Sequence, residues 1–387
     1  MDLIPAVPRR LRRVQERFVE GNRVTLLRDA AQAFPSMLEA IRGARRQVLL
    51  EMYWFDSDRT GRRFAEALAD ARSRGVEVAV IYDSLGSWEA DPRMFSELKE
   101  AGAHVIEFNP MMPWKKRFRL ARLSLRDHRK ILVVDGEKGF TGGVNLADVW
   151  LPEEEEGQAW RDDMICVQGP AVSGLMNLFQ RTWEREGGAP LRASPRGQGG
   201  SGPIGDQRVH VLGENYALRR REITSAYLLN IYRARSRVWL TNSYFVPDGT
   251  VTRALKRAAR RGVDVRVILP AFSDVEIVRH ASRAMWGGLM RSGVRLFEFY
   301  RSILHSKSAV IDGTWSTIGS FNLDYRSLRA NLEVNVAVQD SGFGAVMEES
   351  FRKDLEHCRE VDAHEFKFRP LGHRLLEVIL YRFRKFL

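Results

Sequence analysis

Two histidine–lysine pairs are the residues of this sequence best suited to chemistry. His128 and Lys130 open the apolar segment "HRKILVVD", and His305 and Lys307 open "HSKSAVID". Residues i and i+2 of a β-strand point to the same face, so each lysine is expected beside its histidine. An imidazole can act as a nucleophile or as a general acid and base, and an ammonium group can bind phosphoryl oxygens.

The two pairs belong to a longer repeat. Asp135 and Asp312 follow the pairs at equal spacing, and both copies read H-x-K-x4-D-x6-G-[GS]-x-N, ending at Asn145 and Asn322. One histidine near a strand end is more often structural than catalytic. Each fixed position is matched by chance roughly once in twenty residues. A random match to the whole pattern therefore has a probability of about 10⁻⁷ per starting position. Two matches therefore indicate an internal duplication.

The duplication extends to the surrounding elements. Residues 45–55 parallel residues 235–245, each an apolar strand pattern that ends in aromatic residues. Both copies continue with an Ala- and Arg-rich helical stretch, a strand, a helix ending at glycine and another strand before the motif. This β-α-β-α-β-β order predicts an α/β fold of two tandem halves, each a mixed sheet flanked by helices. A pseudo-twofold axis between the halves would create one shared site at their interface.

Composition changes suggest the boundaries of the domains. Residues 1–186 form the first half, and residues 187–206, rich in Gly, Pro and Ser, form a linker or mobile loop. Residues 207–362 form the second half. Residues 363–387 place apolar and basic residues at the spacing of a basic amphipathic helix. That helix could pack against its own domain or lie on a membrane.

Charge and cysteine content narrow the choice of partner and compartment. The 387 residues carry a net charge of +12, which predicts a polyanionic partner, either a nucleic acid or an anionic membrane surface. Two cysteines are too few for a disulfide framework and favour a reducing, cytosolic setting. No apolar run approaches the roughly 18 to 20 residues of a transmembrane helix, so any attachment to a membrane would be peripheral.

The first half carries an additional segment, "MMPWKKRFRLARLS", just before its motif. It is either a surface loop or an interfacial loop at the mouth of the site. In the second case Trp114 and Phe118 would enter lipid, while Lys115 and Lys116 would contact headgroups.

Two histidines and two lysines at one site suit a phosphodiester substrate. One neutral imidazole can attack phosphorus, and the other, protonated, can give its proton to the departing alkoxide. A covalent phosphohistidine results, and the second histidine then deprotonates an incoming alcohol or water. The lysines would hold the nonbridging oxygens. The sequence shows no carboxylate cluster of the two-metal kind, so neither a metal nor another cofactor is expected.

The paired motifs resemble those of the phospholipase D superfamily, and the resemblance covers roughly residues 40–360. Within the superfamily, "DHRKILVVDGEKGFTGGVNLAD" and "HSKSAVIDGTWSTIGSFNLDYRS" are most similar to bacterial cardiolipin synthases. The segments "EMYWFDSDRTG" and "WRDDMICVQGPAV" point the same way. The sequence lacks the two N-terminal transmembrane helices of some of these synthases, so it resembles the short, peripheral type.

The resemblance implies roles for matching residues. His128 would be the nucleophile and His305 the general acid and base, with the reverse assignment left open. The remaining motif positions implied in catalysis or substrate binding are Lys130, Lys307, Asp135, Asp312, Asn145, Asn322, Gly143 and Ser320. Of these, Asp135 and Asp312 are more simply turn-forming residues that anchor the motif. Asp162 and Glu333 would hydrogen-bond the histidines and fix their tautomers.

The leading function is then a cardiolipin synthase, which transfers a phosphatidyl group between two phosphatidylglycerol molecules and releases glycerol. It would act peripherally on the cytoplasmic side of the bacterial cell membrane. The alternatives are a phospholipase D that uses water, a nuclease, and a non-catalytic scaffold that binds anionic lipid. Nucleic acid is the less favoured partner because apolar anchors accompany the basic residues. A scaffold would not need both histidines. The oligomeric state and the preferred alcohol stay open.

Overall fold

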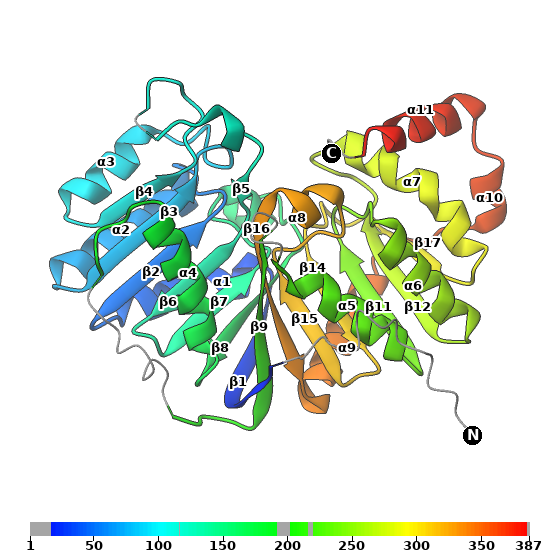
Figure 1. The fold of residues 1–387 in the computed structure, drawn as a ribbon, viewed down its shortest axis with the longest axis horizontal. Helices are drawn as coiled ribbons and strands as arrows, with labels where there is room; N and C mark the ends of the chain where they lie inside the picture. Colours follow the sequence, from blue (N-terminus) through cyan, green and yellow to red (C-terminus); the bar gives the residue numbers. More distant parts are fainter. Residues whose placement is uncertain (1–16, 116, 192–201, 216–219, 385–387) are drawn as a thin grey trace.

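The structure is a computed structural model that describes residues 17–115, 117–191, 202–215 and 220–384. It shows two halves side by side, each built on a mixed β-sheet with helices against it (Figure 1). The strands of the first half follow the order β4-β3-β2-β6-β7-β8-β1 across the sheet. Their bounds are β1 (Val19–Arg28), β2 (Gln47–Met52), β3 (Glu77–Asp83), β4 (His104–Phe108), β6 (Lys130–Val134), β7 (Lys138–Gly142) and β8 (Asp163–Gln168).

The second half repeats this order and adds one strand, giving β17-β13-β12-β11-β14-β15-β16-β9. Its strands are β9 (Gln207–Asn215), β11 (Arg237–Asn242), β12 (Asp264–Pro270), β13 (Arg295–Phe299), β14 (Lys307–Ile311), β15 (Trp315–Gly319), β16 (Asn331–Gln339) and β17 (Cys358–Glu360). β1 and β9 pair with each other in antiparallel register, which joins the two sheets. The α/β fold of two duplicated halves expected from the sequence is confirmed.

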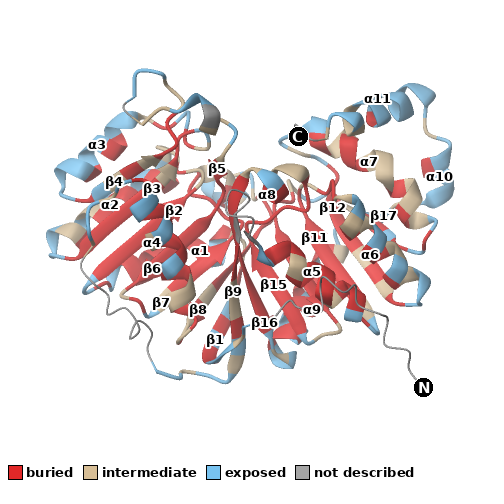
Figure 2. Cartoon of the chain, viewed as in Figure 1, coloured by how far each residue is buried: buried red, intermediate tan, exposed pale blue. Residues whose placement is uncertain are grey.

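Helices cover each sheet and also lie where the halves meet. The outer helices are α1 (Asp29–Arg42), α2 (Arg59–Ser73) and α3 (Pro92–Glu100) in the first half, and α5 (Glu222–Arg233), α6 (Gly249–Arg260) and α7 (Glu276–Met290) in the second. The inner helices are α4 (Val172–Arg185) and α9 (Ser341–Leu355). A single buried cluster combines residues of both halves, including Ile131 and Phe179 with Val336 and Phe351. Figure 2 shows the strands buried almost throughout. The halves therefore share a hydrophobic core, whose burial stabilises their interface.

Asp135 and Asp312 stabilise the fold at a distance from the motif histidines. Each lies in the left-handed region, with φ of 55° and 51°, and begins the tight Asp-Gly turn after its motif strand. The carboxylate of Asp135 accepts hydrogen bonds from the backbone N–H groups of residues 45–47, and that of Asp312 from residues 235–237. Each aspartate lies five positions after its lysine along an extended strand, a distance of roughly 16 Å. These contacts support the anchoring role expected for the two aspartates, and neither lies among the residues that line the cavity with the histidines.

The C-terminal segment differs from the single helix expected over residues 363–387. Two helices, α10 (Ala363–Lys367) and α11 (Leu371–Arg382), occupy it, and residues 385–387 lie outside the described part. Pro370 separates them, because its ring has no N–H to continue a helix. α11 packs against α7 through Leu380 and Tyr381. The expected linker, residues 187–206, connects α4 to β9, and its residues 192–201 are not described. No helix in the described ranges is both long and apolar enough to cross a bilayer.

Candidate active site

Each motif begins at the interface between the halves, where its backbone pairs with the opposite half. His128 follows the short strand β5 (Arg126–Asp127), which runs parallel to the start of β16. The N–H of His128 donates to the carbonyl of Leu332 at 3.0 Å, and the N–H of His305 donates to the carbonyl of Arg161 at 2.8 Å. The duplicated fold therefore places both histidines at one site.

The orienting carboxylates also cross between the halves. His128 Nδ1 lies 3.0 Å from Glu333 Oε2, and His305 Nδ1 lies 2.7 Å from Asp162 Oδ2. All four side chains are buried. A carboxylate at Nδ1 holds the proton on that nitrogen and leaves Nε2 free for chemistry. This geometry supports the roles expected for Asp162 and Glu333, and it shows that each serves the histidine of the other half.

Gly143 and Ser320 contact these carboxylates, whereas the sequence predicted that they contact the substrate. A Cβ on Gly143 would come within 2.1 Å of Asp162 Oδ1, so only glycine leaves space for that side chain. At the equivalent position, the hydroxyl of Ser320 donates to Glu333 Oε2. The longer acid, Glu333, thus has the Ser320 hydroxyl as a hydrogen-bond partner. The shorter acid, Asp162, instead lies against Gly143, which has no side chain. The two positions therefore fit the carboxylates and not a phosphate.

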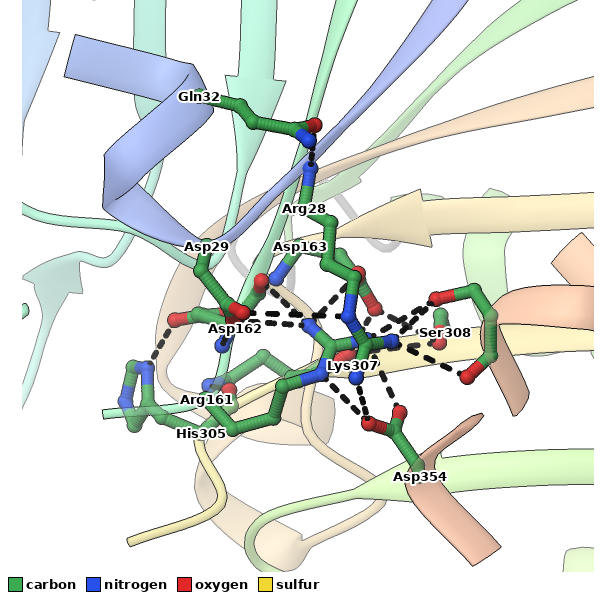
Figure 3. Close-up of polar contacts among 12 residues, drawn as sticks. Arg28, Asp29, Gln32, Arg161, Asp162, Asp163, His305, Lys307, Ser308 and Asp354 are labelled. Atoms are coloured by element: carbon green, nitrogen blue, oxygen red, sulfur yellow. Dashed lines mark hydrogen bonds and ion pairs between the residues drawn. The ribbon is translucent and has the colours of Figure 1, made fainter. Parts of the chain in front are cut away.

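A buried ion-pair network holds the strand that carries Asp162 (Figure 3). The guanidinium of Arg161 lies 2.8 Å from Asp163 and makes two contacts with Asp354 of α9, at 2.7 and 2.9 Å. Arg28 binds the same carboxylate of Asp354 at 2.6 Å. The backbone of Arg161 accepts from His305, so the network fixes the histidine's backbone as well as its carboxylate partner. Sequence reasoning did not identify Arg161 or Asp354.

Burial changes the proton affinity of the catalytic groups. It lowers the pKa of His128 to about 4, although the adjacent Glu333 acts against that shift. Burial also lowers the pKa of Lys130 to about 7 and that of Lys307 to about 8. The lysine ammonium groups donate to the carbonyls of His128 and His305 in their own motifs. His128 is therefore neutral near pH 7, as a nucleophile must be.

The site opens into a cavity of about 320 Å³. Both histidines line it, together with Asn145 and Asn322. The side-chain oxygen of Asn145 accepts from the N–H of Trp54 at 3.2 Å, and that of Asn322 accepts from the Ser243 hydroxyl at 2.8 Å. With their oxygens occupied, the two asparagines can offer amide N–H groups to a phosphate, and that of Asn145 also donates to the carbonyl of Gly143 at 3.5 Å.

Several residues that line the cavity were not singled out by the sequence analysis. They are Tyr53, Trp54, Arg126, Trp160, Tyr244, Asp274, Val275, Val278, Asp324, Arg326 and Asn331. Asp324 and Arg326 stand directly after the second motif in "NLDYRS", and Trp160 stands two residues before Asp162. Proximity to a motif was the available signal for these three. Asp274 and Val275 come from the segment before α7 and had no such signal.

The additional segment before the first motif forms an exposed surface. The Trp114 side chain is 77% exposed and that of Leu120 74%. Lys115 pairs with Glu107 at 2.6 Å, while Phe118 is half-buried. Lys116 lies outside the described residues.

The duplicated fold and the paired histidines at the interface define a phospholipase D-like enzyme. The sequence family described as "Cardiolipin synthase, PLD-like domain" matches residues 37–183 and 227–355. The chain is 32% identical to the cardiolipin synthase of Alkalihalophilus pseudofirmus, over 91% of this chain and 70% of that protein. It is 34% identical to cardiolipin synthase A of Pseudomonas putida F1, over 93% and 74%.

The chain belongs to the cardiolipin synthase family of phospholipase D-like phosphatidyltransferases. Solved structures show the same fold at lower sequence identity. Phosphatidylserine synthase of Haemophilus influenzae aligns with a TM-score of 0.69 and 12% identity, covering 96% of this chain and 97% of that one. The polyphosphate kinase of Porphyromonas gingivalis aligns with a TM-score of 0.56 and 14% identity, covering 86% and 50%. The resemblance stated from the sequence is confirmed.

Proposed function

We propose that this enzyme converts two molecules of phosphatidylglycerol into cardiolipin and glycerol. The observation that carries the proposal is the pair of histidines facing one cavity, each oriented through Nδ1 by a carboxylate of the opposite half. Two equivalent imidazoles suit a reaction of two displacements, in which one group attacks phosphorus and the other transfers the proton.

In the first displacement, Nε2 of His128 attacks phosphorus of the donor lipid and forms a P–N bond. The bond from phosphorus to the glycerol oxygen breaks, and His305 Nε2–H gives its proton to the departing alkoxide. In the second, His305 takes the proton from a hydroxyl of another phosphatidylglycerol, whose oxygen attacks phosphorus and releases His128. Lys130 and Lys307 neutralise the nonbridging oxygens throughout, and Asn145 and Asn322 donate to them.

The direct test is a product assay with purified protein and phosphatidylglycerol vesicles, read by mass spectrometry. Cardiolipin and glycerol in equal amounts are the expected products, and His128→Ala abolishes both. Phosphatidic acid without cardiolipin would make the enzyme a hydrolase. No turnover of lipid at all would overturn the proposal.

We further propose that the enzyme works peripherally at the cytoplasmic leaflet of the membrane. The segment between β4 and β5 and the helix α11 lie at the same edge of the molecule, on either side of α8 (Tyr325–Arg329) (Figure 1). Leu371, Leu375 and Val378 of α11 are 77%, 63% and 59% exposed. Exposed Arg374 and Arg382 are on the same helix. Apolar side chains beside basic ones suit a surface of anionic lipid.

Co-sedimentation with vesicles tests this surface. Wild-type protein is expected to bind vesicles of phosphatidylglycerol more strongly than vesicles of phosphatidylcholine, and Leu375→Glu weakens the binding. Val346→Glu on α9 is the matched control, since Val346 is 48% exposed. Equal loss in both variants would contradict the role of α11.

A further inference from the structure

The active-site cavity is symmetric in its histidines but not in its walls. Two positions after the motif asparagine, the first half has Ala147 and the second half has Asp324. Two positions before the orienting carboxylate, the first half has Trp160 and the second half has Asn331. Trp160, Asp324 and Asn331 line the cavity, so the second half contributes two residues with hydrogen-bond acceptors where the first contributes one aromatic side chain.

Asp324 and Asn331 present acceptors deep in the cavity. They are 7% and 8% exposed, and both line it. One oxygen of Asp324 accepts from the N–H of Ser327 at 2.7 Å, where it caps the first turn of α8. The amide of Asn331 donates to Glu333 at 3.1 Å, while its oxygen is buried with no donor among the described residues. A buried acceptor of this kind is stabilised by a ligand that brings a hydroxyl group.

A second carboxylate lies beside His305. The hydroxyl of Tyr244 donates to Asp274 Oδ2 at 2.6 Å, and the Tyr244 ring lies 6.2 Å from the imidazole of His305. Burial lowers the pKa of His305, and the charge of Asp274 opposes that shift. Asp274 is therefore held by a tyrosine whose ring packs against His305.

The charges around these acceptors favour a neutral polyol over a cationic headgroup. Arg326 lines the same cavity, and its guanidinium group would repel an ammonium ion, whereas Arg126 is paired with the buried Asp83. Burial raises the pKa of Asp324 to about 7, so its negative charge near neutral pH is incomplete. Hydroxyl groups gain hydrogen bonds from such acceptors without bringing a charge.

We propose that Asp324, Asn331 and Asp274 form a subsite for a vicinal diol, the headgroup of phosphatidylglycerol. The assignment rests on the proposed phosphatidyl transfer. Since the two displacements are chemically the reverse of each other, one subsite holds the departing glycerol and then the incoming hydroxyl. The three residues line the same cavity as both histidines, so a diol bound there can reach the reacting phosphorus.

The test separates the choice of alcohol from total activity. The donor is the p-nitrophenyl ester of phosphatidic acid, whose leaving group has no diol, and glycerol and 1-propanol compete as acceptors in one reaction. The ratio of phosphatidylglycerol to phosphatidylpropanol is measured by mass spectrometry.

Wild-type enzyme is expected to favour glycerol. Asp324→Asn keeps the helix cap, and Asp274→Asn removes the second charge. Each lowers the ratio about 10-fold, the usual effect of losing one hydrogen bond.

Glu276→Gln is the matched control, since Glu276 is an exposed carboxylate two residues from Asp274 and leaves the ratio unchanged. An unchanged ratio in the Asp324 and Asp274 variants, with transfer still occurring, would overturn the subsite alone. A wild-type preference for ethanolamine over glycerol would also overturn it, because the subsite would then bind an ammonium group. If the wild-type enzyme releases no p-nitrophenol, the proposed function fails and the subsite with it.

Discussion

His305 and Asp162 are 143 positions apart in the sequence, yet Nδ1 of the histidine lies 2.7 Å from Oδ2 of the aspartate. The reciprocal pair, His128 and Glu333, spans 205 positions and 3.0 Å. Each half therefore supplies one motif histidine and the carboxylate that lies at Nδ1 of the other. The site exists only where the two halves are packed together.

The roles of the two histidines can be separated with a good leaving group. p-Nitrophenolate departs without protonation, so His305→Ala is expected to release one equivalent of p-nitrophenol per enzyme in a rapid burst and then to stall. His128→Ala gives no burst because it cannot form the P–N bond. Stopped-flow absorbance measures the burst, and His364→Ala, an exposed position on α10, serves as control. A burst from His128→Ala and none from His305→Ala would reverse the assignment.

Gly143→Ala is expected to reduce turnover more than Ser320→Ala. The added methyl group would displace the carboxylate of Asp162 from His305, because its Cβ would lie 2.1 Å from Oδ1. Loss of the oriented imidazole costs about 10²–10⁴-fold in rate, the usual contribution of a general acid and base. Ser320→Ala removes one hydrogen bond to Glu333, worth about 1.5–3 kcal/mol, and leaves its bond to His128 in place. Initial rates with phosphatidylglycerol compare the two, and equal rates would contradict the steric argument.

The dependence of kcat/KM on pH should fall on its alkaline side as the lysines lose their protons. The pKa values of Lys130 and Lys307 are lowered to about 7 and about 8, and only the protonated amine neutralises the phosphoryl oxygens. Activity is therefore highest below these values and declines as pH rises through them. On the acidic side, activity declines as pH falls toward about 4, where His128 gains a proton.

Lys130→Arg provides the check on the alkaline limb. A guanidinium keeps its proton at high pH, so the variant should be slower overall while its alkaline decline moves to higher pH. Rates of p-nitrophenol release across the pH range measure the shift. An alkaline limb that does not move would assign the decline to a group other than Lys130.

Asp354→Asn is expected to destabilise the protein by about 1.5–3 kcal/mol, because it weakens the charged hydrogen bonds to the buried guanidinium of Arg161, which keeps its ion pair with Asp163. The matched control is Glu360→Gln, which breaks the pair with Arg295. Both members of that pair are close to half exposed, so the cost is about 1 kcal/mol or less. Urea denaturation measures both. If the two variants lost similar free energies of unfolding, the buried ion pairs of Arg161 would contribute no more stability than an exposed pair.

The sequence by itself determined the duplication, the α/β class and the candidates for the reacting groups. The spacing of His128, Lys130 and Asn145, repeated at His305, Lys307 and Asn322, carries that information, since it reports local strand and turn geometry. Asp162 and Glu333 were also found from their place after each motif. All of these features depend on the residue spacing within short segments, which can be read directly from the sequence.

Tertiary structure decided which partner each residue meets. Pairing of β1 with β9, and of β5 with β16, turns the halves so that the carboxylates cross between them. The same packing places Arg161 against Asp354 and brings Asp274 and Asp324 into one cavity. It also leaves Asp135 and Asp312 at the far ends of their strands. Contacts between residues more than a hundred positions apart depend on how whole sheets pack, and no local pattern records that arrangement.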